Sequence, residues 1–373
     1  MSDRSLGRAI RGRWTLMSLV AVLGAGALVA GCGSDNNEGS SSSGKTIALL
    51  LSEHTTARYE TQDRPNFVRK VEQLCPDCNI VYENANQDAS QQQAQADSVL
   101  TQGIDAMVLD PVDAQSASTI VAKANAQHVP VVSYDRLVSN ADLDAYISFD
   151  NVRVGRLQAT ALADKLKQDG KSTGPIVEIN GAPTDNNAHL FKQGANSVFS
   201  KDGVKLAKSY DTPDWSPAEA QNEMQQAITA LGNGGFAGVY AANDGTAGGA
   251  IAAMKAAGVN PATRPTTGQD AELAGIQRIL AGQQYMTVYK AVKPEAQDAA
   301  EMAVDLAEGK PLPSNLVNQH VDNGKKNVPS VILTPVAVTK SNIEDTVVKD
   351  GYWTPSQICT SAFESACRAA GIH

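Results

Sequence analysis

The sequence is poor in positive charge, which argues against nucleic acid as a partner. Its 373 residues include 31 lysines and arginines against 40 aspartates and glutamates. Four of the arginines and one aspartate precede Cys32, so residues 32–373 carry a formal net charge of −12. A body this acidic repels a phosphate backbone, and no stretch of it forms a basic stripe. Nucleic-acid binding is therefore not expected.

The sequence also lacks the motifs of metal and nucleotide chemistry. Its five histidines show no spacing typical of metal ligands, and no twelve-residue calcium loop is present. Residues 169–172 resemble the end of a phosphate-binding loop, but Lys165 stands where the first glycine of that loop would be. We expect no metal site and no nucleotide site.

Long apolar runs are absent except near the N-terminus. The run 16–29 follows Arg13 and has about 14 residues, too few to span a bilayer comfortably, so residues 1–31 are predicted to be a signal peptide. Small residues lead into Cys32, a pattern that resembles the lipobox of bacterial lipoproteins. The resemblance implies that Cys32 becomes the lipidated N-terminus of an exported protein held at the outer face of the cell membrane. The alternative is an ordinary signal peptide followed by a coincidental cysteine. Residues 32–44 are polar and serine-rich, and we expect a flexible tether.

The other four cysteines form two local pairs in the sequence. Cys75 stands near Cys78, and Cys359 stands near Cys367. Outside the cytoplasm neighbouring thiols tend to pair, so we predict two local disulfides. A redox motif, a four-thiolate zinc site and free thiols remain as alternatives, and the zinc site would require the two distant pairs to meet.

From Lys45 onward, short apolar runs alternate with longer amphipathic stretches. This pattern is typical of parallel strands covered by helices on both faces. It restarts after Asn151, so the sequence predicts an α/β protein with two doubly wound lobes. The predicted strands are 46–51, 79–82, 106–109, 129–134, 145–149, 176–179, 239–241 and 286–289. The predicted helices of the first lobe are 67–74, 88–102 and 118–127.

Planar polar side chains follow several of these strands. In open α/β sheets the ligand binds at the carboxyl ends of the strands. Carboxylates, amides and guanidinium groups there can each bind neighbouring hydroxyls of a neutral polyol, and an aromatic ring can cover the apolar face of a sugar. The other interpretation is that each Asp or Asn is only a helix N-cap. The strand-end groups are Asp135 and Arg136, Asp150 and Asn151, Asp185 and Asn187, Asn243 and Asp244, Gln269 and Asp270, and Lys290.

In combination these motifs resemble the xylose-binding proteins, which are sugar-binding components of ATP-driven (ABC) importers. The resemblance runs from Lys45 to Tyr352 and rests on 134–136, 146–151, 183–188, 243–250, 268–270 and 286–290. It implies the type I periplasmic binding protein fold, in which two Rossmann-like lobes joined by three crossovers close over one sugar. It also implies a monomer without a cofactor that delivers a monosaccharide, xylose first, to a membrane permease served by a separate ATPase subunit.

The resemblance implies a division of the chain and a set of ligand-binding residues. The first lobe would comprise 45–150 with 291–321 and the second 151–290 with 322–350, and the cysteine-bearing tail 351–373 lies beyond the resemblance. Hydroxyls of the sugar would be bound by Asp135 and Arg136 of the first lobe, by Asp185, Asn187, Asn243 and Asp270 of the second, and by Lys290 at the hinge. Trp215 matches the stacking tryptophan of the family.

The first loop departs from the family pattern. Arg58 and Tyr59 stand where the family has arginine and tryptophan, and the resemblance implies that both bind the sugar. The spacing from there to Phe67 is one residue longer than in the family.

Other functions fit the sequence less well than sugar capture does. Asp135, Asp185 and Asp270 in one cleft could serve a glycosidase, but their Arg, Asn and Lys neighbours favour ionised acceptors over a general acid. A ligand-sensing repressor would need a helix-turn-helix before Lys45, and none is found. A receptor that feeds a membrane sensor, and a binder of another monosaccharide such as ribose, remain as alternatives.

Overall fold

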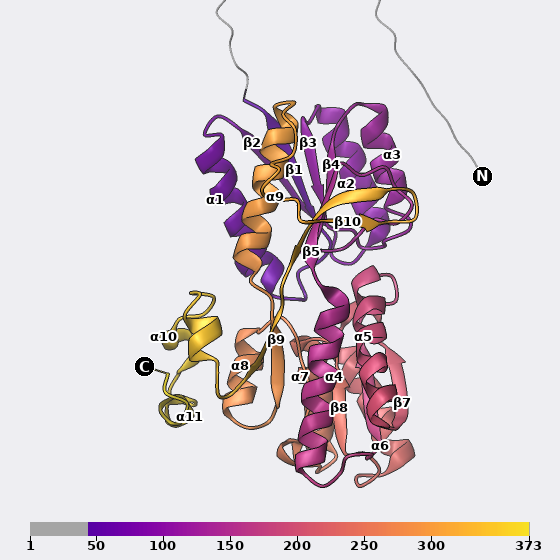
Figure 1. The fold of residues 1–373 in the computed structure, drawn as a ribbon, viewed down its shortest axis with the longest axis vertical. Helices are drawn as coiled ribbons and strands as arrows, with labels where there is room; N and C mark the ends of the chain where they lie inside the picture. The colour runs from indigo at the N-terminus through magenta and orange to yellow at the C-terminus, as the bar shows by residue number, and fades with distance from the viewer. Residues whose placement is uncertain (1–43, 373) are drawn as a thin grey trace, which may run out of the picture. The chain divides into compact units, whose positions relative to one another are not determined.

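The computed structural model describes residues 44–372. The predicted signal peptide, Cys32 and almost all of the predicted tether lie outside the described residues. The described residues form two lobes (Figure 1), each with helices on both faces of a sheet. The predicted α/β class with parallel-sheet lobes is confirmed. None of the helices within this range is both long enough and apolar enough to cross a bilayer.

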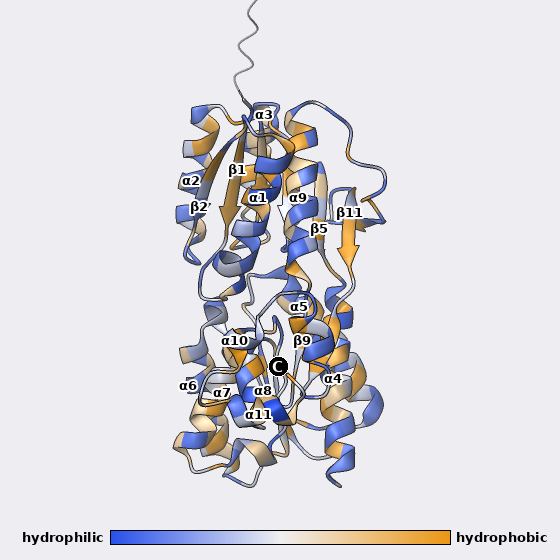
Figure 2. Cartoon of the chain, turned by 90° about the vertical axis from the view of Figure 1, so that its left-hand side faces the viewer, coloured by the Kyte–Doolittle hydropathy of each residue, from blue (hydrophilic) through white to orange (hydrophobic). Residues whose placement is uncertain are grey.

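The first lobe is built on seven strands in the order β10-β11-β5-β4-β3-β1-β2. Neighbouring strands pair in parallel, except that β10 runs antiparallel to β11. The strands are β1 (Thr46–Leu51), β2 (Asn79–Asn84), β3 (Ala106–Leu109), β4 (Val131–Tyr134), β5 (Ala145–Phe149), β10 (Gln319–Asp322) and β11 (Asn327–Leu333). In Figure 2, β1 and β11 are coloured toward the hydrophobic end of the scale.

Helices cover both faces of this sheet because its central strands are apolar on both sides. In β1, Ile47 and Leu49 pack into one core with α1 and α9, whereas Ala48 and Leu50 pack into the other with α2 and α3. The helices of this lobe are η1 (Tyr59–Asp63, a π-helix), α1 (Arg64–Leu74), α2 (Ala89–Gln102), α3 (Ser118–Ala126) and α9 (Val292–Ala307).

The division of the chain between the lobes differs from the prediction near residue 321. Residues 322–333 were expected in the second lobe, but β11 pairs in parallel with β5, and its Ser330 lies opposite Tyr146. The chain therefore leaves the first sheet only after Leu333. Hydrophobic patterning marks a strand but does not say which sheet it joins, and this explains the error.

The second lobe contains a three-stranded parallel sheet, β7-β6-β8, and the antiparallel pair β12-β9. The segment 265–270 lies between them, since Thr267 N donates to Val239 O of β8 and Val288 N of β9 donates to Gly268 O. The strands are β6 (Ile176–Asn180), β7 (Leu206–Asp211), β8 (Gly238–Ala241), β9 (Met286–Tyr289) and β12 (Val336–Thr339). The helices are α4 (Asn151–Gln168), α5 (Asn186–Asp202), η2 (Pro213–Trp215), α6 (Pro217–Leu231), α7 (Asp244–Ala256), η3 (Pro261–Thr263), α8 (Leu273–Leu280) and η4 (Glu344–Val348).

Helices α4 and α5 pack unusually closely through two glycines. A Cβ atom on Gly155 of α4 would lie 1.9 Å from Phe191 O, and one on Gly194 of α5 would lie 2.1 Å from Val152 O. Any side chain at either position would force the two helices apart. This contact places the N-terminal turn of α5 beside the start of α4, where the chain crosses between the lobes.

The chain crosses between the lobes at three points in the described range (Figure 1). These crossings follow β5, β9 and β11 and lead into α4, α9 and β12. The two local disulfides are present, Cys75–Cys78 after α1 and Cys359–Cys367 near the C-terminus. Beyond Gly351 the chain forms α10 (Pro355–Ile358) and α11 (Glu364–Ala369), which pack on the second lobe around α8.

Candidate functional site

A single pocket contains all ten residues that the sequence predicted to bind a ligand. Its walls come from both lobes. Thr56 and Phe191 line it as well and were not predicted, and Gln269 was predicted only as a strand-end group. The complete lining is Thr56, Arg58, Tyr59, Asp135, Arg136, Asp185, Asn187, Phe191, Trp215, Asn243, Gln269, Asp270 and Lys290.

Arg58 is fully desolvated and neutralised by three carboxylates. Its Nε donates to Asp63 Oδ2 over 3.0 Å, its Nη2 lies 2.6 Å from Glu295 Oε2, and its Nη1 lies 3.4 Å from Asp135 Oδ1. A buried guanidinium is tolerated only with such partners. Glu295 comes from α9, so this network fixes the first loop to the helix that enters the first lobe from the hinge.

Asp135 is held as an ionised acceptor at the centre of the pocket. Burial alone would raise its pKa, but Arg58, Lys290 and Arg136 outweigh burial and hold the pKa of Asp135 well below its usual value. The Tyr59 hydroxyl donates to Asp135 Oδ2 over 2.8 Å. The residue has φ of +53°, and its backbone oxygen accepts from Asn187 Nδ2 of the second lobe over 3.0 Å.

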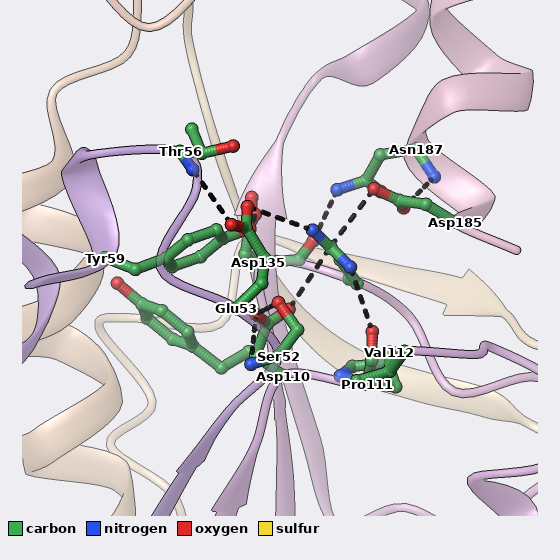
Figure 3. A network of polar contacts seen from close by, with 12 residues as sticks. Ser52, Glu53, Thr56, Tyr59, Asp110, Pro111, Val112, Asp135, Asp185 and Asn187 are labelled. Atoms are coloured by element: carbon green, nitrogen blue, oxygen red, sulfur yellow. Dashed lines mark hydrogen bonds and ion pairs between the residues drawn. The ribbon is translucent and has the colours of Figure 1, made fainter. Parts of the chain in front are cut away.

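Arg136 joins the two lobes beneath the pocket. Its Nε lies 3.1 Å from Asp185 Oδ2 of the second lobe, and within the first lobe its guanidinium lies 3.6 Å from Asp110 and 3.7 Å from Glu53. Burial raises the pKa values of Glu53 and Asp110, and Arg136 opposes that rise in both. Figure 3 shows Asp185 and Asn187 facing Asp135 across the boundary between the lobes.

Asp185 and Asn243 are helix N-caps and pocket residues at once. Asp185 Oδ1 accepts from Asn187 N over 2.8 Å at the start of α5, and Asn243 Oδ1 accepts from Thr246 N over 2.8 Å at the start of α7. Capping therefore uses one oxygen of each side chain and leaves the remaining atoms of the group for other contacts. Asp150 also follows a strand and caps a helix, but it is exposed and lies outside the pocket.

Trp215 supplies a flat apolar wall. It has φ of +54°, its Nε1 donates to Asp185 Oδ2 over 3.1 Å, and Phe191 meets it edge-on with ring centroids 6.3 Å apart. A Cβ atom on Gly181 would lie 2.0 Å from the indole ring, so the ring can lie against the chain only at a glycine. Burial of the indole and its anchored nitrogen fix the plane of the ring.

Asp270 and Lys290 lie on the second lobe near the hinge. Lys290 Nζ is 3.1 Å from Asp270 Oδ1 and 3.8 Å from Asp135 Oδ1, so one ammonium contacts carboxylates of both lobes. Asp270 has φ of +84° and Ala271 has φ of +48°, which makes this turn costly for residues other than glycine. Neighbouring structure must therefore hold the turn.

Three buried atoms of the lining make no hydrogen bond within residues 44–372: Arg136 Nε, Gln269 Oε1 and Asp270 Oδ1. Two of them already stand in ion pairs, since Arg136 Nε lies 3.1 Å from Asp185 Oδ2 and Asp270 Oδ1 lies 3.1 Å from Lys290 Nζ. Of the three, Gln269 Oε1 alone has neither a hydrogen bond nor an ion pair within that range. Leaving a buried polar atom without a partner costs about 1–3 kcal/mol, so this amide oxygen fits a ligand that donates a hydrogen bond, as a hydroxyl does.

The lobes also bond to each other outside the pocket. Ala114 N donates to Thr184 O over 3.0 Å, and Gln87 Nε2 donates to Asp214 O over 3.3 Å. These bonds, with the Arg136–Asp185 pair, describe lobes closed on the pocket. Residues 44–372 contain no cluster of three or more His, Cys, Asp or Glu side chains that could hold a metal ion.

The strand-end rule found most of this site and could have found more. Asp110 directly follows β3, and Glu53 follows β1 by two residues, so both satisfied the rule that found Asp135. Phe191 lies one helical turn after Asn187 and is indistinguishable from a core residue in the sequence. Thr56 carries no sequence signal of its own.

Comparison with known proteins gives a consistent result. Residues 47–311 match the family model "Periplasmic binding protein domain". The D-xylose-binding periplasmic protein of Escherichia coli is 40% identical over 316 residues, which cover 84% of this chain and 92% of that protein. The multiple sugar-binding periplasmic receptor ChvE of Rhizobium radiobacter is 32% identical over 329 residues, covering 84% of this chain and 92% of that protein. An ABC transporter solute binding protein from Clostridium phytofermentans, solved with bound β-D-glucose, superimposes with a TM-score of 0.76 at 27% identity, covering 84% of this chain and all of that one.

Proposed function

The chain belongs to the periplasmic binding protein family, whose members bind substrates and are not enzymes, and from that premise we propose that it captures a monosaccharide outside the cytoplasm. The observation that carries the proposal is a buried pocket in which polar atoms, those of the ion-paired Arg136 and Asp270 and the unpartnered Gln269 Oε1, lie beside the ring of Trp215. Hydroxyls of a sugar pair with such atoms, and the C–H face of a sugar packs on an indole.

The charges of the pocket favour an uncharged ligand. The lining contains three cationic side chains, Arg58, Arg136 and Lys290, and three carboxylates, Asp135, Asp185 and Asp270. A pocket for a phosphate or a carboxylate would show an excess of positive charge, because an anion loses its hydration on entry. Here the carboxylates and the cations already pair with each other, so a neutral polyol adds hydrogen bonds without adding charge.

D-xylose is our first candidate for the sugar. Two relatives, from Escherichia coli and Haemophilus influenzae, are D-xylose-binding proteins at 40% and 38% identity. The second candidate is another monosaccharide such as ribose, or glucose, which the glucose-bound structures favour.

We further propose that the closed, loaded protein delivers its sugar to an ABC permease with a separate ATPase subunit. The family match and the ABC transporter relatives support this assignment. Lipidation of Cys32 would keep the protein at the membrane beside that permease. A receptor that passes the signal to a membrane sensor would use the same closed lobes.

Isothermal titration calorimetry of the purified protein tests the proposal. We expect one-to-one binding of D-xylose, tighter than binding of D-ribose or D-glucose. The melting temperature should rise with it, since a ligand present at 100 times its Kd adds about 2.7 kcal/mol to the free energy of unfolding. If no aldopentose or aldohexose binds at millimolar concentration, the sugar-binding proposal is wrong. If glucose binds tighter than xylose, only the choice of sugar is wrong.

A further inference from the structure

Residues 351–372, here called the C-terminal segment, lie against the binding pocket through the Asp270 turn. The Tyr352 hydroxyl donates to Asp270 O over 3.1 Å, and Trp353 Nε1 donates to Ala271 O over 2.8 Å. The two acceptors, Asp270 and Ala271, are consecutive residues with positive φ, and Asp270 carries the carboxylate of the pocket. Tyr352 and Trp353 are 6% and 8% exposed, so both hydrogen bonds are shielded from water.

From these contacts we infer that the C-terminal segment is a positioning device for Asp270. A turn of two non-glycine residues in the left-handed region persists only when its surroundings hold it. Ala271 N donates to Thr287 Oγ1 over 3.2 Å on one side, and the two aromatic donors bind the carbonyl oxygens on the other. Hydrogen bonds thereby hold both the amide nitrogen of Ala271 and the carbonyl oxygens of the turn. The inference rests on the proposed function only in taking Asp270 as a ligand-binding residue.

The aromatic pair is itself fixed to the second lobe. The Tyr352 ring meets Tyr289 with centroids 5.1 Å apart and Trp353 with centroids 5.4 Å apart. Ile358 and Cys367 are buried in the same apolar cluster, and Gln277 of α8 donates to the carbonyl oxygen of Ile358 over 3.2 Å. The Cys359–Cys367 disulfide closes the loop that directly follows Ile358 and links its start to the buried Cys367. Figures 1 and 2 both show α10 beside α8.

The C-terminal segment also contacts the first lobe. Gln62 of η1 donates through Nε2 to Tyr352 O over 3.2 Å. Gln62 thus belongs to the first lobe, whereas Tyr352 packs on the second lobe and donates its hydroxyl to Asp270 O. The segment therefore contributes to closure of the lobes as well as to the shape of the pocket.

Tyr352→Phe and Trp353→Phe test the inference, because each removes a donor and keeps an aromatic ring. We expect the Kd for D-xylose to rise about threefold to tenfold in each variant, the usual effect of one lost hydrogen bond. Hydrogen exchange of the Asp270 and Ala271 amides should speed up in the sugar-free protein. The control is Ile228→Val, which removes a methylene from the core between α6 and the sheet, away from the pocket. It should lower the melting temperature and leave both the Kd and those two amides unchanged.

The disulfides provide a second, matched pair of variants. Cys359→Ser with Cys367→Ser should raise the Kd for D-xylose, whereas Cys75→Ser with Cys78→Ser, in the first lobe, should not. Gln62→Leu should raise the dissociation rate constant of the sugar without lowering the melting temperature of the sugar-free protein, because its bond to Tyr352 joins the lobes only when they are closed.

The outcomes separate this inference from the proposed function. Wild-type Kd together with unchanged exchange at Asp270 and Ala271 in both aromatic variants would overturn the positioning role while sugar binding stands. If the wild-type protein binds no sugar, the proposed function fails. The exchange of the two amides in the sugar-free variants then decides alone whether the segment holds the turn.

Discussion

At the scale of single residues, each charge at the pocket has a partner of opposite sign. Arg58 pairs with Asp63 and Glu295, Arg136 with Asp185, and Lys290 with Asp270. Buried ions are costly, and removing one partner is more damaging than removing the pair. Substitutions that keep the shape of a side chain and remove only its charge therefore test each of these ion pairs directly.

Asp270→Asn should weaken sugar binding and should also destabilise the sugar-free protein, because the buried Lys290 loses its nearest carboxylate. The amide keeps the size of the carboxylate but has one acceptor oxygen in place of two, at a cost of about 1–3 kcal/mol in binding free energy. Calorimetry measures the affinity, and scanning calorimetry without sugar measures the stability. Asp150→Asn is the matched control, since Asp150 also follows a strand and caps a helix but lies outside the pocket. Equal affinities for the two variants would remove Asp270 from the binding site.

Asp135→Asn should destabilise the protein, and the loss should depend on pH. Arg58, Lys290 and Arg136 overcome the effect of burial and lower the pKa of Asp135 in the folded state. Its contribution to stability is therefore complete above the unfolded-state pKa near 3.8 and is lost as the pH falls toward the lowered pKa. Urea unfolding at pH 7 should show a loss of about 3–5 kcal/mol in the variant. At pH 3 the difference from wild type should be smaller, and a difference that grows on acidification would contradict the assignment.

At the scale of elements, the sequence predicted the strands with apolar runs and missed β7, β10, β11 and β12. Strands β1, β3 and β5 are apolar along their length, so the hydrophobic pattern marks them. Strand β7 lies at a sheet edge, with side chains that are at most half-buried, and it carries no such pattern. Strand β11 was assigned to the wrong lobe because its pairing with β5 joins segments that are distant in the sequence.

The extra residue between Tyr59 and Phe67 finds a physical explanation in η1. This element is a π-helix in which Arg64 N donates to Tyr59 O, five residues back. A π-turn accommodates one inserted residue without rotating the elements on either side. Arg58 and Tyr59 therefore reach the pocket while Phe67 stays in the core.

Deleting the exposed Thr61 should accordingly be tolerated. The π-turn should convert to an α-turn, and the melting temperature should fall less than in the control deletion of Lys70. That deletion lies within regular α1 and rotates Val71 out of the core by about one helical step of 100°. Thermal unfolding of the two variants measures the difference. Equal losses would show that η1 is required in its present form.

At the scale of the whole molecule, contacts between the two lobes close the pocket. The lobes contact each other through the Arg136–Asp185 pair, the Ala114–Thr184 bond and Asn187, which together close the pocket. A ligand that pairs with atoms of both lobes binds best to this closed form and shifts the population toward it. The sequence predicted which side chains meet, because strand ends of both sheets converge, but not the bonds between loops.

The proposed lipid anchor should determine where the protein is found in the cell. With Cys32→Ser we expect the protein to leave the membrane fraction and to appear in the soluble or secreted fraction, because the acyl chains would be lost. Cell fractionation and immunoblotting measure the distribution. Retention in the membrane fraction would indicate a different attachment of the N-terminus.

The most direct test of the account is a crystal structure of the protein with D-xylose. We predict one pyranose between the lobes, with hydroxyls within hydrogen-bond distance of Asp135, Arg136 and Asp270 and one face on the Trp215 ring. Sugar bound at another place, or a pocket free of sugar at a concentration that saturates binding in solution, would contradict the account.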